Sequence, residues 1–278
     1  MTLCSGYEFM KLADICIDSI KIHSKIKKDI KHFIFLEKYN SNDIEILKGA
    51  KKIYIVTNKI ITAFDVFYKY FNNDVTIITH NSDRPVDKKH IKYINLPKIK
   101  KWFAQNTLIQ HKKLYTLPIG IANPQWKHGN IELLKQIKTI DKTKENLLFT
   151  NFELGTGKKN SIRKPILDTL KRNDFETKFN RVDQKKYWLM LASSKFSISP
   201  EGGGIDCHRI WECIFLKTIP IVYRHIAFKQ FEELPILFID NWNIITREFL
   251  EEQWIKFSQK TFNIDKIYTE YWKNKINK

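Results

Sequence analysis

Short apolar runs alternate with amphipathic segments along most of this chain. The β-branched runs at residues 52–57 and 75–79 predict two buried strands, and residues 60–71 between them carry apolar side chains at helical spacing. A strand, a helix and a second strand in this order form a βαβ unit, whose parallel sheet binds ligands at the carboxyl ends of its strands. The polar residues 80–83 are therefore expected at a ligand-binding edge.

A second series of alternating elements begins near residue 146. The predicted strands are residues 147–150, 175–179, 195–199, 219–223 and 236–239, and the predicted helices are residues 161–172, 184–192 and 206–216. This density of alternation predicts an α/β fold with a second parallel sheet covered by helices on both faces. The polar stretch 141–145 is the expected linker between an N-terminal domain (1–140) and a C-terminal domain (141–250). The remaining residues (251–278) form an amphipathic helical segment that can pack back on the N-terminal domain.

Composition and charge narrow the function classes. The 48 basic and 30 acidic residues leave a formal charge of +18, which attracts polyanions, phosphorylated ligands and acidic membrane surfaces. Lysines scattered beside Ile and Asn explain much of this excess, and neither an Arg-rich helix nor a sheet with base-stacking aromatic residues is evident, so we expect no nucleic acid partner. The four cysteines lack C-x-x-C spacing, and we find neither a signal peptide nor an 18-residue apolar run. We expect a soluble, cytoplasmic protein whose membrane contacts, if any, are peripheral.

The most informative stretch reads Ser-Pro-Glu-Gly-Gly-Gly-Ile-Asp-Cys-His-Arg-Ile-Trp-Glu-Cys over residues 199–213. Three consecutive glycines between a strand and a helix remove every Cβ from the turn, so a phosphate or ribose can approach the backbone and the turn can adopt positive φ. The helix that follows offers free N–H groups and the positive end of its dipole. Asp206 is placed to cap this helix.

Helical spacing puts Ile205, His208, Arg209 and Glu212 on one face of that helix, which we expect to look toward a ligand. Arg209 is suited to neutralise a diphosphate, and Glu212 to accept hydrogen bonds from both ribose hydroxyls, as a carboxylate does in dinucleotide-binding folds. The alternative is an ordinary glycine turn followed by an Arg209–Glu212 pair on a helix surface.

The motif over residues 199–212, followed by Ile-Pro-Ile-Val at 219–222, resembles the donor-site signature of exostosin-like glycosyltransferases with the GT-B fold. Residues 148–152 with Arg163 resemble the family's first C-terminal strand and the basic residue after it, and residues 234–242 resemble its closing segment. Softer similarities to the acceptor-side part of bacterial and viral members are found at residues 102–106, Lys113, 117–120 and 126–129. Gly203 departs from the Asn that family members often carry between the outer glycines. The resemblance implies two Rossmann-like domains facing each other across a cleft, and an inverting transfer from a UDP- or GDP-linked sugar to a glycan hydroxyl.

The residues predicted to bind the nucleotide-sugar donor come mainly from this motif. They are Asn151, Arg163, Ser199, Glu201, Gly202, Gly203, Gly204, Asp206, Arg209 and Glu212. The resemblance implies a reaction without a metal, and the chain indeed lacks an Asp-x-Asp triad that would hold a cation against a diphosphate. Positive charge would come instead from Arg163, Arg209, Lys158 or Lys159.

An inverting reaction needs a general base on the N-terminal domain to take the proton of the acceptor hydroxyl. Asp83 and His80 at the end of a strand are the first candidates and His128 is the third, although each also fits a turn, core or loop role. Trp102 and Trp126, in segments expected to be polar loops, are candidates to stack on an acceptor sugar. A non-catalytic glycan- or nucleotide-binding protein of the same fold and a basic nucleic-acid-binding protein stay open as alternatives.

Overall fold

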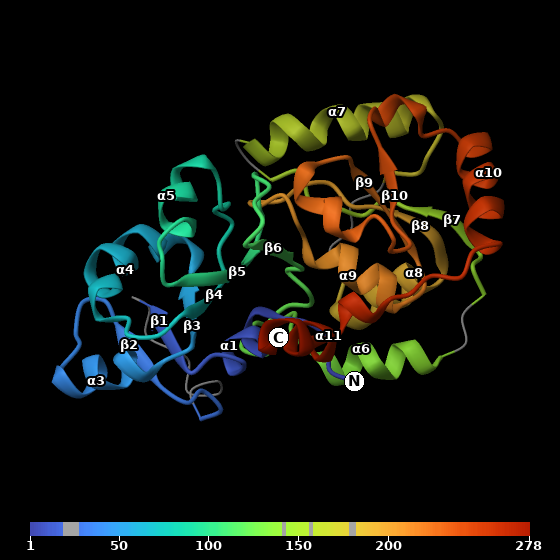
Figure 1. Ribbon diagram of the computed structural model, residues 1–278. Helices are drawn as coiled ribbons and strands as arrows, with labels where there is room; N and C mark the ends of the chain where they lie inside the picture. Colours follow the sequence, from blue (N-terminus) through green and yellow to red (C-terminus); the bar gives the residue numbers. More distant parts are fainter. Residues whose placement is uncertain (19–27, 141–142, 156–157, 178–181) are drawn as a thin grey trace. The chain divides into compact units, whose positions relative to one another are not determined.

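A computed structural model describes residues 1–18, 28–140, 143–155, 158–177 and 182–278 (Figure 1). The chain forms two compact units, one made of Met1–Gly129 with Tyr268–Lys278 and the other of Asn130–Ile267. This division differs from the boundary expected at residue 140. Helix α6 (Ile131–Thr139) belongs to the second unit because it packs against α8 (Gln184–Ala192).

The first unit is built on a six-stranded parallel sheet with the strand order β2-β1-β3-β4-β5-β6. Its strands are β1 (Ile15–Asp18), β2 (Phe33–Phe35), β3 (Lys52–Val56), β4 (Val75–His80), β5 (Ile99–Gln105) and β6 (Leu114–Leu117). The connecting helices are α1 (Gly6–Lys11), α3 (Ser41–Gly49), α4 (Ile60–Phe67) and α5 (Ile91–Ile94), with short 3-10 turns η1 (Thr57–Lys59), η2 (Tyr68–Tyr70) and η3 (Lys88–His90). The βαβ unit predicted from residues 52–79 is confirmed, because β3 and β4 pair in parallel across α4.

Aromatic side chains from α4 cover this sheet. Phe64 and Phe67 are 2% and 0% exposed, and the Phe64 ring stacks on Trp102 of β5 with centroids 5.4 Å apart. Every residue of β4 is buried, including Thr76, Thr79 and His80, as expected for a central strand covered on both faces. The core therefore fixes the carboxyl ends of β3 and β4, where polar loop residues begin.

The second unit contains a four-stranded parallel sheet with the order β10-β9-β8-β7. Its strands are β7 (Asn146–Phe149), β8 (Ser194–Ile198), β9 (Ile219–Tyr223) and β10 (Leu237–Ile239), and its other elements are α7 (Lys158–Arg172), α9 (His208–Phe215), α10 (Arg247–Ser258), η4 (Ile226–Phe231), η5 (Trp242–Ile244) and η6 (Asp265–Ile267). The α/β class with two parallel sheets is as predicted. The strand expected at 175–179 is absent from residues 175–177, and its last two residues lie outside the described part of the chain.

The C-terminal segment is divided between the two units rather than being one helix. Helix α10 belongs to the second unit, whereas α11 (Thr269–Asn277) belongs to the first. Leu3 and Tyr268 form an antiparallel bridge, the Thr269 N–H donates to the Thr2 carbonyl at 2.8 Å, and Trp272 is fully buried. Across the described residues, no helix is long and apolar enough to cross a membrane.

Candidate functional site

The glycine turn joins the carboxyl end of β8 to the start of α9, where a parallel sheet is expected to bind ligands. The Ser199 N–H donates to the Ile221 carbonyl at 3.0 Å, and the Gly202 N–H donates to the Gly204 carbonyl at 3.0 Å. Among the described glycines, positive φ occurs at Gly120 and Gly155 rather than in this turn. The expectation of left-handed backbone is therefore wrong, and the feature that Gly202 provides is open space beside the backbone.

Arg163 reaches the turn from α7. Its Nε donates to the Glu201 carbonyl at 2.9 Å, and its Nη1 donates to the Glu153 carbonyl at 2.5 Å. A Cβ on Gly202 would lie 3.7 Å from Arg163 Nη2, an ordinary contact distance. The guanidinium thus ties the loop after β7 to the glycine turn and stays beside it.

Arg209 reaches the same place from the first turn of α9. Its Nε donates to the Tyr187 hydroxyl at 2.9 Å, and its Nη1 donates to the Ile198 carbonyl at 2.9 Å, at the last residue of β8. Tyr187 comes from α8, and nothing in the sequence motif pointed to it. These bonds turn Arg209 inward to the strand end, instead of leaving it on an open helix face.

Neither guanidinium has a carboxylate partner within ion-pair distance among the described residues; both donate to neutral oxygens. Burial and the neighbouring charge of Arg209 lower the pKa of Arg163, so the two cations lie close enough to repel each other. The Cys207 thiol is close to both guanidinium groups; burial raises its pKa to about 11 despite them. Two half-buried cations beside a glycine turn are chemically suited to hold an anion.

Asp206 does not cap α9 as expected. The N-cap residue is Cys207, whose side chain makes no capping bond, and both carboxylate oxygens of Asp206 accept from the Trp211 indole N–H, at 2.9 and 3.0 Å. Asp206 is 6% exposed. Its carboxylate fixes the buried Trp211 under the turn, which is a positioning role.

Glu212 is also placed differently from the expected open polar face. It is 5% exposed, and burial raises its pKa to about 7, an effect that the facing Trp188, Arg209 and Tyr187 groups only partly offset. The Trp188 indole N–H faces this carboxyl without completing a hydrogen bond of ordinary geometry. A role for Glu212 in binding ribose remains a prediction.

The other predicted donor residues are distributed around the turn. Ser199 and Gly204 are buried, Asn151, Glu201 and Gly202 are half-buried, and Gly203 is exposed. The Lys158 and Lys159 side chains lie outside the described part of the structure. The turn, Arg163 and Arg209 are therefore the part of the predicted donor site that hydrogen bonds bring together.

His80 is a core histidine rather than an available base. It is 1% exposed, and its Nδ1 accepts from the Asn81 N–H at 2.8 Å while its Nε2 lies 3.0 Å from the Pro118 carbonyl. Its ring also packs on Phe9. Because both ring nitrogens have partners, His80 holds the end of β4 in place, and we withdraw it as a general base.

Asp83, His128 and Trp126 lie on the surface of the first unit. Asp83 is exposed in the loop after β4, His128 is exposed, and Trp126 is 57% exposed. Their exposure leaves them accessible to an acceptor, and their catalytic and stacking roles stay predictions.

Trp102 cannot stack on an acceptor sugar, because it is a fully buried residue of β5. Besides stacking on Phe64, its Nε1 donates to Thr79 Oγ1 at 3.0 Å. The sequence suggested a polar loop since Lys100, Lys101 and Gln105 surround it, but this strand pairs on both sides with β4 and β6.

We expect substitution of the buried Trp102 to lower the free energy of unfolding and substitution of the exposed Trp126 to leave it almost unchanged. Trp102→Phe removes an indole hydrogen bond and part of a packed ring, and should lower the free energy of unfolding by about 1–2 kcal/mol. Trp126→Ala should change it by no more than about 0.5 kcal/mol. Urea unfolding of both variants measures the difference; equal losses would contradict this placement.

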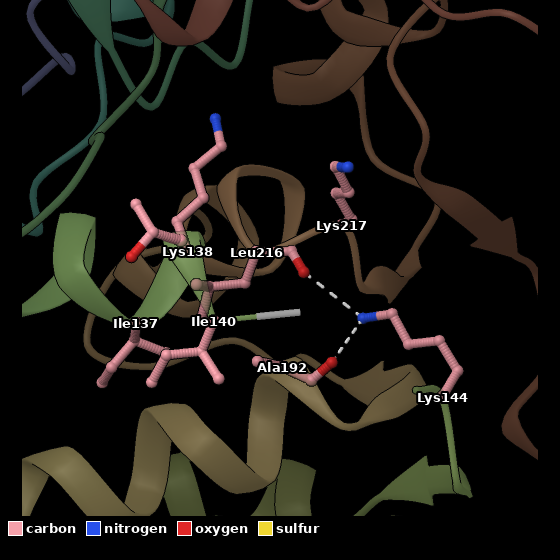
Figure 2. A pocket seen from close by; sticks show the side chains of 8 residues that line it. Ile137, Lys138, Ile140, Lys144, Ala192, Leu216 and Lys217 are labelled. Atoms are coloured by element: carbon pink, nitrogen blue, oxygen red, sulfur yellow. Dashed lines mark hydrogen bonds between the residues drawn. The ribbon is translucent and has the colours of Figure 1, made fainter. Parts of the chain in front are cut away.

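A separate pocket of about 260 Å³ lies at the amino ends of β7, β8 and β9. Figure 2 shows Lys144 reaching the carbonyl oxygens of Ala192 and Leu216, at 2.7 and 3.3 Å, and its ammonium also donates to Thr218 Oγ1 at 3.0 Å. These contacts join the C-terminal ends of α8 and α9. Lys144 therefore has a structural role on the sheet edge opposite the glycine turn.

The fold is that of an α/β protein with two parallel sheets, and two guanidinium groups lie beside a glycine turn at a strand end. No known family profile matches the chain. The chain is similar to ribitol-5-phosphate xylosyltransferase 1 of Danio rerio, with 26% identity over 126 residues, covering 41% of this chain and 28% of that protein. A glycosyltransferase from Rickettsia africae ESF-5 aligns structurally over 97% of this chain and 89% of its own, with a TM-score of 0.47 and 14% identity. In the described residues, His, Cys, Asp and Glu do not gather in any group of three that could hold a metal.

Proposed function

We propose that this chain is a glycosyltransferase that binds a nucleotide-sugar at the carboxyl edge of its second sheet. The observation that carries this proposal is the pair of guanidinium groups, Arg163 and Arg209, which flank the glycine turn without carboxylate partners among the described residues. The similarity to a xylosyltransferase supports the general class. The finer assignments are also proposals: a two-domain GT-B arrangement, a UDP- or GDP-linked donor, a glycan acceptor and an inverting, metal-independent transfer.

The chemistry of sugar transfer explains why two cations suit this position. When the glycosidic bond of the donor breaks, negative charge develops on the departing diphosphate. Fixed cations held by hydrogen bonds stabilise that charge without reorganising. The space left by Gly202 allows the phosphate oxygens to approach both the backbone and Arg163.

The first unit would supply the acceptor side of the reaction. We propose Asp83 as the general base that takes the proton of the attacking hydroxyl, with His128 as the second candidate. Asp83 follows β4 at the carboxyl edge of the first sheet and is exposed. Trp126, also exposed, is the proposed stacking surface for the acceptor.

A thermal-shift screen with nucleoside diphosphates and nucleotide-sugars tests the donor assignment, because a ligand that binds only the folded state raises its stability. At a ligand concentration of about 100 Kd the gain is about 2.7 kcal/mol, which is several degrees in Tm. A failure of every nucleotide to shift the melting temperature would sink the proposal.

Gly202→Ala provides the sharpest variant for this screen. In the ligand-free protein the new Cβ meets only Arg163 Nη2 at 3.7 Å, so we expect the free energy of unfolding to change by less than about 1 kcal/mol. The methyl group would, however, occupy the space proposed for a phosphate. The variant should fold normally and lose most of the nucleotide-dependent shift.

Gly49→Ala, at the end of α3, is the matched control because nothing lies within 4 Å of its new Cβ. It should retain the full nucleotide shift. A full shift in Gly202→Ala as well would show that the turn does not hold the diphosphate.

A further inference from the structure

A cavity of about 370 Å³ lies at the carboxyl edge of the first sheet, where β3 and β4 end. Its polar lining consists of Thr57, Asn58, Arg84, Lys89 and His90, and its apolar lining of Ile61 and Pro85. The volume is within the range of sites for small molecules. None of the functional roles considered above uses this cavity.

The described polar groups of the cavity favour hydrogen-bond acceptors from a ligand. Arg84 is exposed, and its one hydrogen bond to a described residue runs from its backbone N–H to Ser82 Oγ, so no described group occupies the guanidinium. Lys89 is exposed, and its nearest carboxylate is Asp87 at 3.5 Å. No carboxylate is among the described residues that line the cavity.

His90 adds a buried ring nitrogen to this set. It is 3% exposed, and burial lowers its pKa despite the nearby Asp87, so the ring is neutral near pH 7. Its Nδ1 lies 3.1 Å from the Asp87 backbone N and 3.0 Å from Asp87 Oδ1, so Asp87 occupies this ring nitrogen from both sides. No described residue forms a hydrogen bond with Nε2, although the ring lines the cavity.

We propose that this cavity binds a phosphate monoester group carried by the acceptor, with the attached polyol filling the rest of its volume. Arg84 and Lys89 would neutralise the phosphate, the Asn58 amide would donate a hydrogen bond to it, and His90 Nε2 would face the ligand. Arg84 directly follows Asp83, the proposed base, so an anchored phosphate holds the acceptor's hydroxyl groups close to that carboxylate. This inference rests on the proposed function and specifies the substrate class of its acceptor side.

Isothermal titration calorimetry with glycerol 3-phosphate tests the site, with glycerol and inorganic phosphate as reference ligands. Glycerol 3-phosphate should bind more tightly than either. Arg84→Met should raise its Kd at least tenfold, whereas Lys88→Met, an exposed neighbour outside the cavity lining, should change it less than twofold. Inorganic phosphate binding equally well, or an unchanged Kd in Arg84→Met, would overturn the proposal.

Binding of a nucleoside diphosphate to the same variants separates this inference from the proposed function. Arg84→Met should bind the nucleotide as the unmodified chain does, because the proposed donor site lies in the second unit. A parallel loss of nucleotide binding in Arg84→Met would overturn the assignment of the cavity to the acceptor. Glycerol 3-phosphate binding that depends on Arg84, without any nucleotide binding, would support the phosphate site and remove the proposed donor function.

Discussion

Arg209→Lys is expected to lower kcat/KM for sugar transfer by about 100- to 1000-fold, the loss typical of removing one fixed donor from a developing negative charge. Lysine keeps the charge but loses the planar fork. In the structure that fork holds the Tyr187 hydroxyl and the Ile198 carbonyl at the same time, each at 2.9 Å. A lysine ammonium cannot reproduce both contacts and still present donors to a diphosphate.

Steady-state kinetics with saturating acceptor measures this effect, and Tyr187→Phe is the matched control. That variant removes only the hydroxyl that accepts from Arg209 Nε and leaves the guanidinium with its contact to β8. We expect Tyr187→Phe to lose less than about tenfold in kcat/KM, since one neutral hydrogen bond contributes about 1 kcal/mol. If Arg209→Lys kept its kcat/KM within threefold of the unmodified chain, Arg209 would not stabilise the leaving group.

Parts of the fold follow from the sequence because parallel strands buried on both faces produce continuous apolar runs. Strand β9 and helix α8 have the predicted bounds, β3 and β4 differ by one residue at one end, and β8 is shifted by one residue. Strand β5 was not predicted because Lys100 and Lys101 interrupt its apolar pattern, and only pairing with two neighbouring strands buries its second half. Such partners are tertiary facts that a local pattern does not contain.

In the candidate site, too, the local features could be predicted from the sequence and the tertiary contacts could not. The glycine turn and the helix after it are local features, and the structure has both where they were expected. The direction of Arg209 and Glu212 depends on Tyr187 and Trp188, which α8 brings from about 20 residues earlier in the chain. Helical spacing gives the shared face of α9, but it does not say that another helix covers that face.

Covering Glu212 has a consequence for stability. Folding raises the pKa of the Glu212 carboxyl from 4.5 to about 7. Between pH 4.5 and pH 7 the folded chain therefore holds a proton on this group that the unfolded chain has released. Stability contributed by this group is therefore complete below pH 4.5, is lost as the pH rises through 7, and stays absent above it. The contribution of this group to the free energy of unfolding is therefore about 3 kcal/mol smaller at pH 8 than below pH 4.5.

Glu212→Gln should therefore unfold with a free energy about 3 kcal/mol larger than that of the unmodified chain at pH 8, and with an equal one at pH 4.5, because glutamine resembles the protonated acid and does not titrate. Urea unfolding at both pH values measures this, and Glu251→Gln, at an exposed position of α10, is the control that should change the free energy of unfolding by no more than about 0.5 kcal/mol. A destabilised Glu212→Gln protein at pH 8 would contradict the raised pKa. If the more stable Glu212→Gln protein also loses nucleotide binding, the donor site uses the Glu212 carboxylate. The chain then keeps this carboxylate at a cost in stability, which is the trade-off expected of a buried binding residue.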